Sequence, residues 1–130
     1  MTGIVIGRFQ VPYLHAGHVH LITSALRQCN KVVIFLACKL EDDGKNPYTI
    51  AHRKQIIKAF FPHVEVVTLW DRQSNEEWSQ IVDLEAGTFE NPVLFHSRDS
   101  FAVHYKGKLS LIKVGEIEGY SGTKLRAETK

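Results

Sequence analysis

The chain has 130 residues, of which 44% are hydrophobic and 23% charged, a composition typical of a globular domain with enough apolar residues for a core. Its 16 basic and 14 acidic residues leave a formal net charge of +2, which gives no case for a nucleic-acid partner. No segment approaches the ~20 apolar residues of a membrane span. The N-terminus also lacks the pattern of a signal peptide. We therefore expect one domain, residues 1–130, located in the cytoplasm, without a nucleic-acid or membrane partner.

Short apolar runs alternate with helical patterns along the chain. The runs are rich in β-branched residues and nearly unbroken, as in strands that are buried on both faces of a parallel sheet. Strands are expected over residues 3–7, 31–37, 64–69, 93–95 and 109–114. Helices are expected over residues 17–29, from the N-cap Thr49 to Pro62, from the N-cap Ser74 through Leu84, over 99–106, and from Ser121 onward.

This alternation predicts βαβ units with right-handed crossovers. The expected fold class is α/β, with a single Rossmann-like, doubly wound, parallel five-stranded sheet. Ligands of such sheets bind at the carboxyl ends of the strands, where the strand order reverses. The expected site therefore consists of the loops that follow strands, which are residues 8–18, 38–46, 70–74 and 96–99.

The first of these loops has residues suited to phosphate binding. It contains Arg8, His15 and His18, together with Gly7 and Gly17 at its two ends. Backbone N–H groups at the start of a helix attract anions, imidazoles add donors, and glycine permits a close approach of the backbone. Because the chain has seven histidines, their spacing alone leaves both a catalytic and a structural role open. The loop as a whole predicts a nucleotide triphosphate site.

A second anion-binding pattern lies near the C-terminus. Ser121, Gly122 and Thr123 begin an expected helix, and Arg126 follows one turn later. Hydroxyl groups, backbone N–H groups and a guanidinium together suit a phosphate group. The same residues would also form an ordinary helix cap with a basic first turn, so the pattern by itself leaves both interpretations open.

Two segments together carry a family resemblance. Gly7-Arg8-Phe9-Gln10 and His15-Ala16-Gly17-His18 follow an N-terminal strand and resemble the nucleotidyltransferase superfamily, whose signature is His-x-Gly-His. The first segment is similar to the nicotinamide mononucleotide (NMN) adenylyltransferases of the archaeal and Nudix-fused type. The C-terminal pattern is similar to the Ser-x-Thr-x-x-Arg motif of that family. The chain departs from the family at Val11–Leu14, which make the spacing from Gln10 to His15 longer than the usual Gln-Pro-x-His.

The resemblance implies an HxGH nucleotidyltransferase fold and the transfer of AMP from ATP to NMN, which yields NAD and pyrophosphate. His15 and His18 would stabilise charge at the α-phosphate, with Arg126 on the phosphates that leave. Such transfer requires positioned donors rather than a covalent nucleophile. By the same resemblance, the residues that contact ATP would be Gly7, Arg8, Phe9, Gln10, Gly17, Lys45, His96, Arg98, Asp99, Ser121 and Thr123.

Acceptor binding is implied for Asp71, Asn75 and Trp78, which are similar to the family's acidic residue followed by Asn-x-x-Trp. A tryptophan that stacks on a positively charged pyridinium ring is physically favourable. The alternative is that Trp78 belongs to the core of its helix. Arg53 matches an arginine that follows the family's Lys-Asn-Pro-Phe-Thr segment, and a structural role is open for it as well.

No protein metal site is expected, because Mg²⁺ can be carried with ATP by the phosphates. Cys29 and Cys38 are too few and too far apart for a zinc site, and we expect them to be reduced structural thiols. The expected partners are the small molecules ATP and NMN. Because the chain continues only to residue 130 after Arg126, we also expect a homo-oligomer that supplies further packing.

Three alternatives remain open at this stage. The same chemistry on another acceptor, such as CTP with glycerol 3-phosphate, would require only a different acceptor pocket. The chain could also be a catalytically silent nucleotide-binding module, or one module of a longer bifunctional enzyme. The sequence does not distinguish NMN from its nicotinate analogue.

Overall fold

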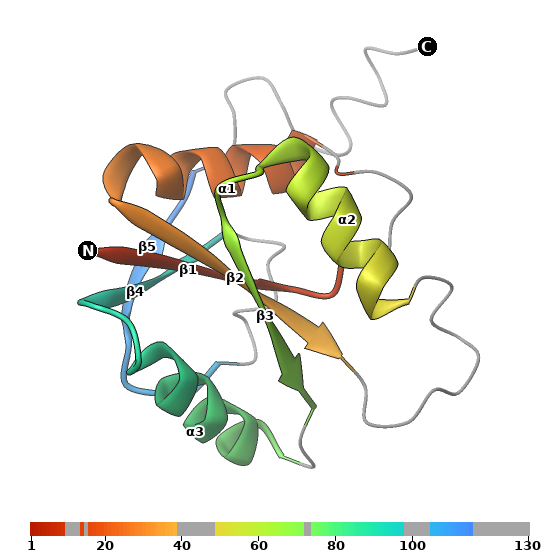
Figure 1. The fold of residues 1–130 in the computed structure, drawn as a ribbon. Helices are drawn as coiled ribbons and strands as arrows, with labels where there is room; N and C mark the ends of the chain where they lie inside the picture. The colour runs from red at the N-terminus through yellow and green to blue at the C-terminus, as the bar shows by residue number, and fades with distance from the viewer. Residues whose placement is uncertain (10–13, 15, 39–48, 72–73, 98–104, 116–130) are drawn as a thin grey trace, which may run out of the picture.

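The structure is a computed structural model, and it describes residues 1–9, 14, 16–38, 49–71, 74–97 and 105–115. These residues form one sheet with the strand order β3-β2-β1-β4-β5, in which every neighbouring pair is parallel (Figure 1). The elements are β1 (Thr2–Gly7), α1 (Ala16–Gln28), β2 (Lys31–Cys38), α2 (Ile50–Phe60), β3 (Glu65–Trp70), α3 (Asn75–Ala86), β4 (Pro92–His96) and β5 (Ser110–Lys113). The predicted α/β class and five-stranded parallel sheet are confirmed.

Two predicted helix starts are confirmed by their capping hydrogen bonds. The Thr49 hydroxyl oxygen accepts from the His52 backbone N–H at 3.0 Å, and the Ser74 hydroxyl oxygen accepts from that of Glu77 at 3.1 Å. Each bond satisfies a backbone donor that has no partner within its own helix. The helix expected over residues 99–106 is not formed at 105 and 106, while residues 98–104 and the helix expected from Ser121 lie outside the described part of the chain.

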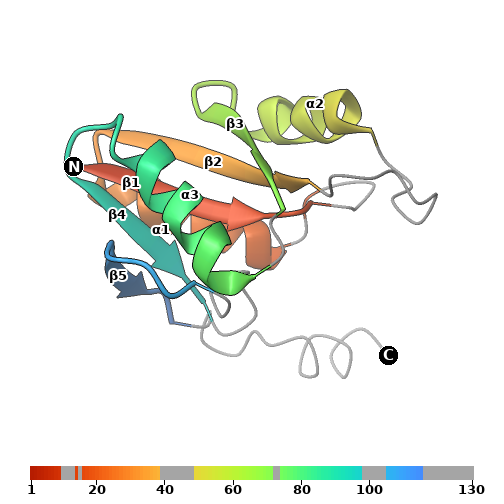
Figure 2. The same ribbon diagram turned by 90° about the horizontal axis from the view of Figure 1, so that it is seen from below.

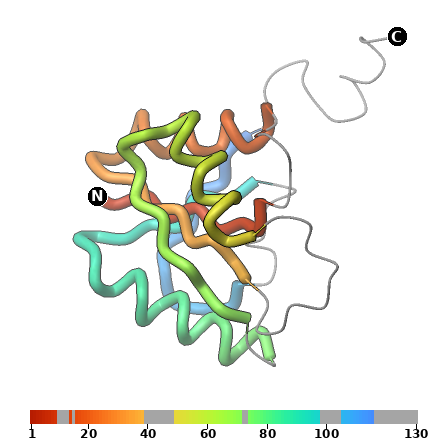
Figure 3. Tube along the Cα trace, turned by 45° about the vertical axis from the view of Figure 1, so that its right-hand side comes forward, coloured from red at the N-terminus to blue at the C-terminus, as the bar shows by residue number. Residues whose placement is uncertain are grey.

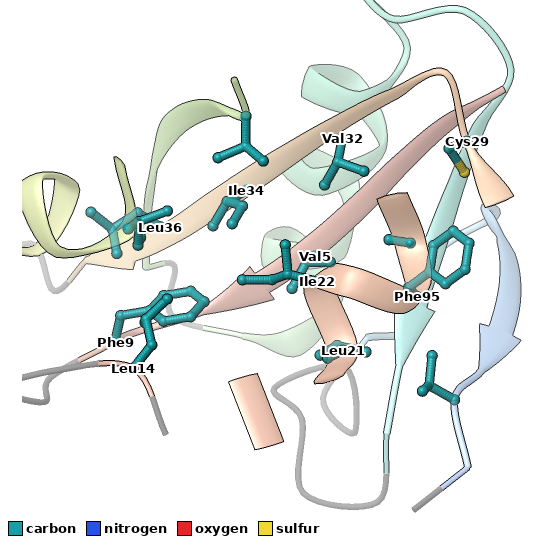
Figure 4. Close-up of a cluster of buried hydrophobic side chains, with 14 of the residues drawn as sticks. Val5, Phe9, Leu14, Leu21, Ile22, Cys29, Val32, Ile34, Leu36 and Phe95 are labelled. Carbon is teal, nitrogen blue, oxygen red and sulfur yellow. The ribbon is translucent and has the colours of Figure 1, made fainter. Parts of the chain in front are cut away.

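The sheet is covered on both faces, as a doubly wound fold requires. One core cluster packs α1 and α2 against the sheet and includes Ile57 of α2. Figure 4 shows Ile22 of α1 beside Val5 of β1 in this cluster. A second cluster packs α3 against the opposite face (Figures 1 and 2). Alternate residues of β1, β2, β3 and β4 therefore enter different clusters, which explains why these strands read as nearly continuous apolar runs.

The strand order places a topological switch beside β1. From β1 the chain winds outward through β2 to β3 and then crosses to β4 and β5 on the other side. Figure 3 shows β1 running through the middle of the fold, between α1 and α3. The carboxyl ends of β1 and β4 lie next to each other there, at the position where open α/β sheets bind ligands.

None of the described helices is long and apolar enough to cross a membrane.

Candidate functional site

An ion pair crosses the carboxyl edge of the sheet. Arg8 follows β1 and Asp71 follows β3, and the Arg8 Nη2 atom lies 2.8 Å from the Asp71 Oδ2 atom. Because β2 lies between these strands, the pair spans the end of β2. The two side chains remain 31% and 27% exposed, so a ligand can reach both. The structure thus joins a residue predicted to bind ATP with one predicted to bind the acceptor.

The second histidine of the His-x-Gly-His segment lies against Phe9. The ring centroids of Phe9 and His18 are 4.9 Å apart, and the rings are tilted by 48°. Phe9 is buried and has a φ of 54°, in the left-handed region that bulky residues seldom adopt. The Nδ1 atom of His18 is also buried. His18 therefore occupies a defined position in the first turn of α1, where the helix presents its backbone N–H groups.

Arg53 reaches the same edge from α2 and is 5% exposed. Its Nη1 atom donates to the Arg8 carbonyl at 2.9 Å and to the Ala37 carbonyl at 3.3 Å. Its Nε atom donates to the Thr49 carbonyl at 3.4 Å, and its Nη2 atom lies 3.5 Å from the Cys38 sulfur. The guanidinium therefore ties the ends of β1 and β2 to α2. The sequence left the role of Arg53 open, and its signal was the match to an arginine that follows the family's Lys-Asn-Pro-Phe-Thr segment.

Cys38 ends β2 beneath the Arg8–Asp71 pair. Burial raises the pKa of the Cys38 thiol, and the neighbouring Arg53 offsets part of that effect. The protonated thiol donates to the Leu36 carbonyl at 3.4 Å. Cys29 is likewise free and buried. The prediction that both cysteines are structural thiols is confirmed.

The other half of the switch is formed by β4 and the segment after β5. His96 is the last residue of β4, is partly buried, and accepts a backbone hydrogen bond from Val114 at 2.7 Å. His20 of α1 lies 2.9 Å from the Gly115 carbonyl through its Nε2 atom. Because a carbonyl oxygen only accepts, Nε2 carries the proton in this contact. Through these two hydrogen bonds, the segment that follows β5 is held against the end of β4 and against α1.

Two residues that were predicted to bind the acceptor, Asn75 and Trp78, differ in their exposure. Asn75 begins α3 and is exposed, near Asp71 in the chain. Trp78 is only 4% exposed and packs with Val82 in the core cluster beneath α3. The core interpretation describes its position, and stacking on an acceptor ring stays a prediction.

Several predicted residues lie outside the described part of the chain, and their predicted roles stay untested. These residues are Gln10, His15, Lys45, Arg98, Asp99, Ser121, Thr123 and Arg126. Of the predicted ATP contacts, Gly7, Arg8, Phe9, Gly17 and His96 all lie at the ends of β1 and β4 or at the start of α1. Within the described ranges, no three side chains that ligate metals come together.

Similar proteins were found by sequence profile and by structure. The profile of the family described as cytidylyltransferase-like matches residues 4–128. A comparison with curated proteins gave no match.

Solved structures with a similar fold include the following three. A bifunctional NMN adenylyltransferase/ADP ribose pyrophosphatase from Francisella tularensis, complexed with AMP and an Mn ion, is 24% identical with a TM-score of 0.65 over 98% of this chain. A NadR protein in complex with NR is 16% identical with a TM-score of 0.66 over 99% of the chain. A NadR protein in complex with NAD and AMP-PNP is 16% identical with a TM-score of 0.64 over 87%.

This chain spans only 40%, 40% and 38% of those three structures. At these identities the likeness establishes the shared fold, which agrees with the parallel sheet and its switch beside β1. The family profile establishes more than the fold, because it matches this sequence from the first strand to within two residues of its end. The chain therefore belongs to the cytidylyltransferase-like family of the nucleotidyltransferase superfamily.

Proposed function

We propose that the chain is an NMN adenylyltransferase, which transfers AMP from ATP to NMN and releases pyrophosphate. The observation that carries this proposal is the placement of Arg8 and His18 together at the carboxyl end of β1, beside the switch, in a member of the nucleotidyltransferase superfamily. A guanidinium and an imidazole at a helix start offer donors to the phosphates of a nucleotide.

In this mechanism the 5′-phosphate of NMN attacks the α-phosphate of ATP, and the bond to the pyrophosphate leaving group breaks. His18, with His15, donates hydrogen bonds to the charge that builds on the α-phosphate. Arg8, Ser121, Thr123 and Arg126 hold the triphosphate. The protein supplies position and electrostatic stabilisation, which together account for most of the catalysis in phosphoryl-type transfers.

Mg²⁺ is proposed to enter with ATP. Because the described residues contain no group of three metal-ligating side chains, the phosphate oxygens would supply most of its ligands. When bound, the ion neutralises charge on the phosphates. We further propose a homo-oligomer with one nucleotidyltransferase domain in each chain.

Asp71 and Asn75 are proposed to face the nicotinamide end of NMN, since both lie at the carboxyl end of β3. Trp78 would stack on the ring only if it left the core, where it is 4% exposed. That burial favours a second candidate, in which the same site transfers a nucleotide, such as the cytidylyl group of CTP, to an acceptor without an aromatic ring.

The test is pyrophosphate release from ATP and Mg²⁺ with NMN, nicotinate mononucleotide, glycerol 3-phosphate and phosphopantetheine as acceptors. We expect turnover on NMN that falls by on the order of a hundredfold in His18→Ala, because a transition-state donor is lost. His63→Ala is the matched control, since His63 is exposed and lies before β3, at the opposite edge of the sheet.

Turnover on another acceptor alone would overturn the choice of NMN. ATP binding without turnover on any acceptor would make the chain a nucleotide-binding module.

A further inference from the structure

We propose that Arg53 is a positioning residue of this site: it fixes the peptide between Arg8 and Phe9 and thereby places the imidazole of His18. The inference rests on the proposed function for its effect on catalysis, while its structural content is independent of any substrate. It is carried by a continuous series of contacts that runs from α2 to the first turn of α1.

The first contact is the guanidinium itself. Arg53 is nearly fully buried, and among the described residues its partners are backbone carbonyls and a thiol rather than a carboxylate. A buried cation without a carboxylate partner is costly unless its donors are satisfied. The planar fork of arginine meets that requirement here by binding the ends of β1 and β2 at the same time. The interaction therefore constrains the relative position of these two strand ends.

The second contact fixes the conformation of Phe9. The carbonyl that Arg53 binds at 2.9 Å belongs to the peptide unit that precedes Phe9. Holding that peptide plane restricts rotation about the φ angle of Phe9, which is 54°. For a residue with a Cβ atom the left-handed region costs about 1–2 kcal/mol, so the surrounding structure must hold the backbone there. The hydrogen bond from Arg53 and the burial of the Phe9 ring both hold the backbone in this conformation.

The third contact passes from the Phe9 ring to His18. A Cβ atom added to Gly7 would lie 2.8 Å from Cε2 of Phe9, so the ring lies directly against Gly7. The same ring contacts the imidazole of His18 at a centroid distance of 4.9 Å. The ring therefore transmits the position of the strand end to the histidine. Glycine at position 7 leaves the space that the ring needs.

Arg53 thus controls two groups proposed to face phosphate, the backbone that carries Arg8 and the ring of His18. Preorganised donors accelerate transfer only when they are held close to their productive geometry. A displacement of about 1 Å can cost on the order of a hundredfold in rate. A residue that touches no substrate can therefore have a large effect on kcat.

The test replaces Arg53 with lysine, which keeps the charge and most of the stem but has no planar fork. The imidazole resonances of ligand-free protein are recorded by NMR, and those of His18 are assigned by their loss in His18→Ala. We expect the His18 resonances to shift in Arg53→Lys, and kcat to fall by on the order of ten- to a hundredfold, with a smaller change in KM for ATP. Arg27→Lys is the matched control, since Arg27 is an exposed arginine in the last turn of α1.

A second variant perturbs the series at another point. Gly7→Ala forces the Phe9 ring to move, because the added methyl group would overlap it, and it leaves Arg53 unchanged. We expect a shift of the same His18 resonances and a loss of kcat. This variant keeps the test decisive if lysine at position 53 does not support the fold.

The two proposals fail in different ways. His18 resonances that match the wild type in either variant would overturn the positioning role, whether or not the enzyme turns over NMN. Shifted resonances together with a wild-type protein that is inactive on every acceptor would support the positioning role and reject the proposed function.

Discussion

The Arg8–Asp71 ion pair leads to a prediction about ATP affinity. The structure pairs a guanidinium proposed to bind phosphate with a carboxylate, so ATP must compete with Asp71 for Arg8. Since both side chains are about one-third exposed, the pair contributes only about 0.5–1 kcal/mol. Asp71→Asn removes this competition and should tighten ATP binding by about two- to fivefold.

The complementary variant is Arg8→Gln, which removes a charge-assisted hydrogen bond to phosphate. Such bonds contribute about 1.5–3 kcal/mol, so ATP affinity should fall by on the order of ten- to a hundredfold. In the Arg8→Gln background, Asp71→Asn should have no further effect on ATP. Calorimetric titration of ATP and Mg²⁺ into the wild type, the two single variants and the double variant completes the cycle.

The control uses a second ion pair at the opposite edge of the sheet. Lys31 and Glu65 begin β2 and β3 and lie 3.4 Å apart. Glu65→Gln removes one partner far from the proposed site, so ATP affinity should stay unchanged. If Asp71→Asn weakened ATP binding as much as Arg8→Gln, Asp71 would hold Arg8 in place for ATP, and the competition argument would be refuted.

Three further predictions concern stability and reactivity. Ser74→Ala removes the cap of α3 and should cost about 1 kcal/mol, measured by urea unfolding, while Ser74→Asp should retain the stability. A thiol reagent should label Cys38 much more slowly than a free thiol, because the side chain is 2% exposed and burial also raises its pKa; labelling at the rate of a free thiol would contradict this. Burial and a hydrogen bond to Asp83 raise the pKa of Tyr105, so the folded state favours the neutral phenol. The free energy of unfolding should therefore fall as the pH rises above about 10, the unfolded value, and should fall less steeply in Tyr105→Phe.

The fold was predictable because the features that determine it lie within short segments of the sequence. The apolar runs, the caps at Thr49 and Ser74, and the alternation of strands and helices determine the class of the sheet, and strand ends differ from prediction by only a few residues. The general rule for ligand sites then places Arg8, Asp71 and His96 along one edge. These residues do lie at that edge in the structure.

The contacts within the site were not predictable, because they join residues far apart in the chain. Arg8 and Asp71 are 63 positions apart, and Arg53 and Arg8 are 45 positions apart. The environment of Trp78 was not predictable either. Its helical spacing fits both a core residue and a ligand-facing residue, and only the packing of α3 under the sheet buries it.

The central claim is that this site transfers AMP to NMN, and one competition experiment tests it directly. ATP and CTP at equal concentration are incubated with Mg²⁺, the protein, and a mixture of NMN and glycerol 3-phosphate, and the products are identified by mass spectrometry. We expect NAD to be the main product and its rate of formation to fall by on the order of a hundredfold in His18→Ala. A cytidylyl product, or an adenylyl product on glycerol 3-phosphate, would contradict the claim.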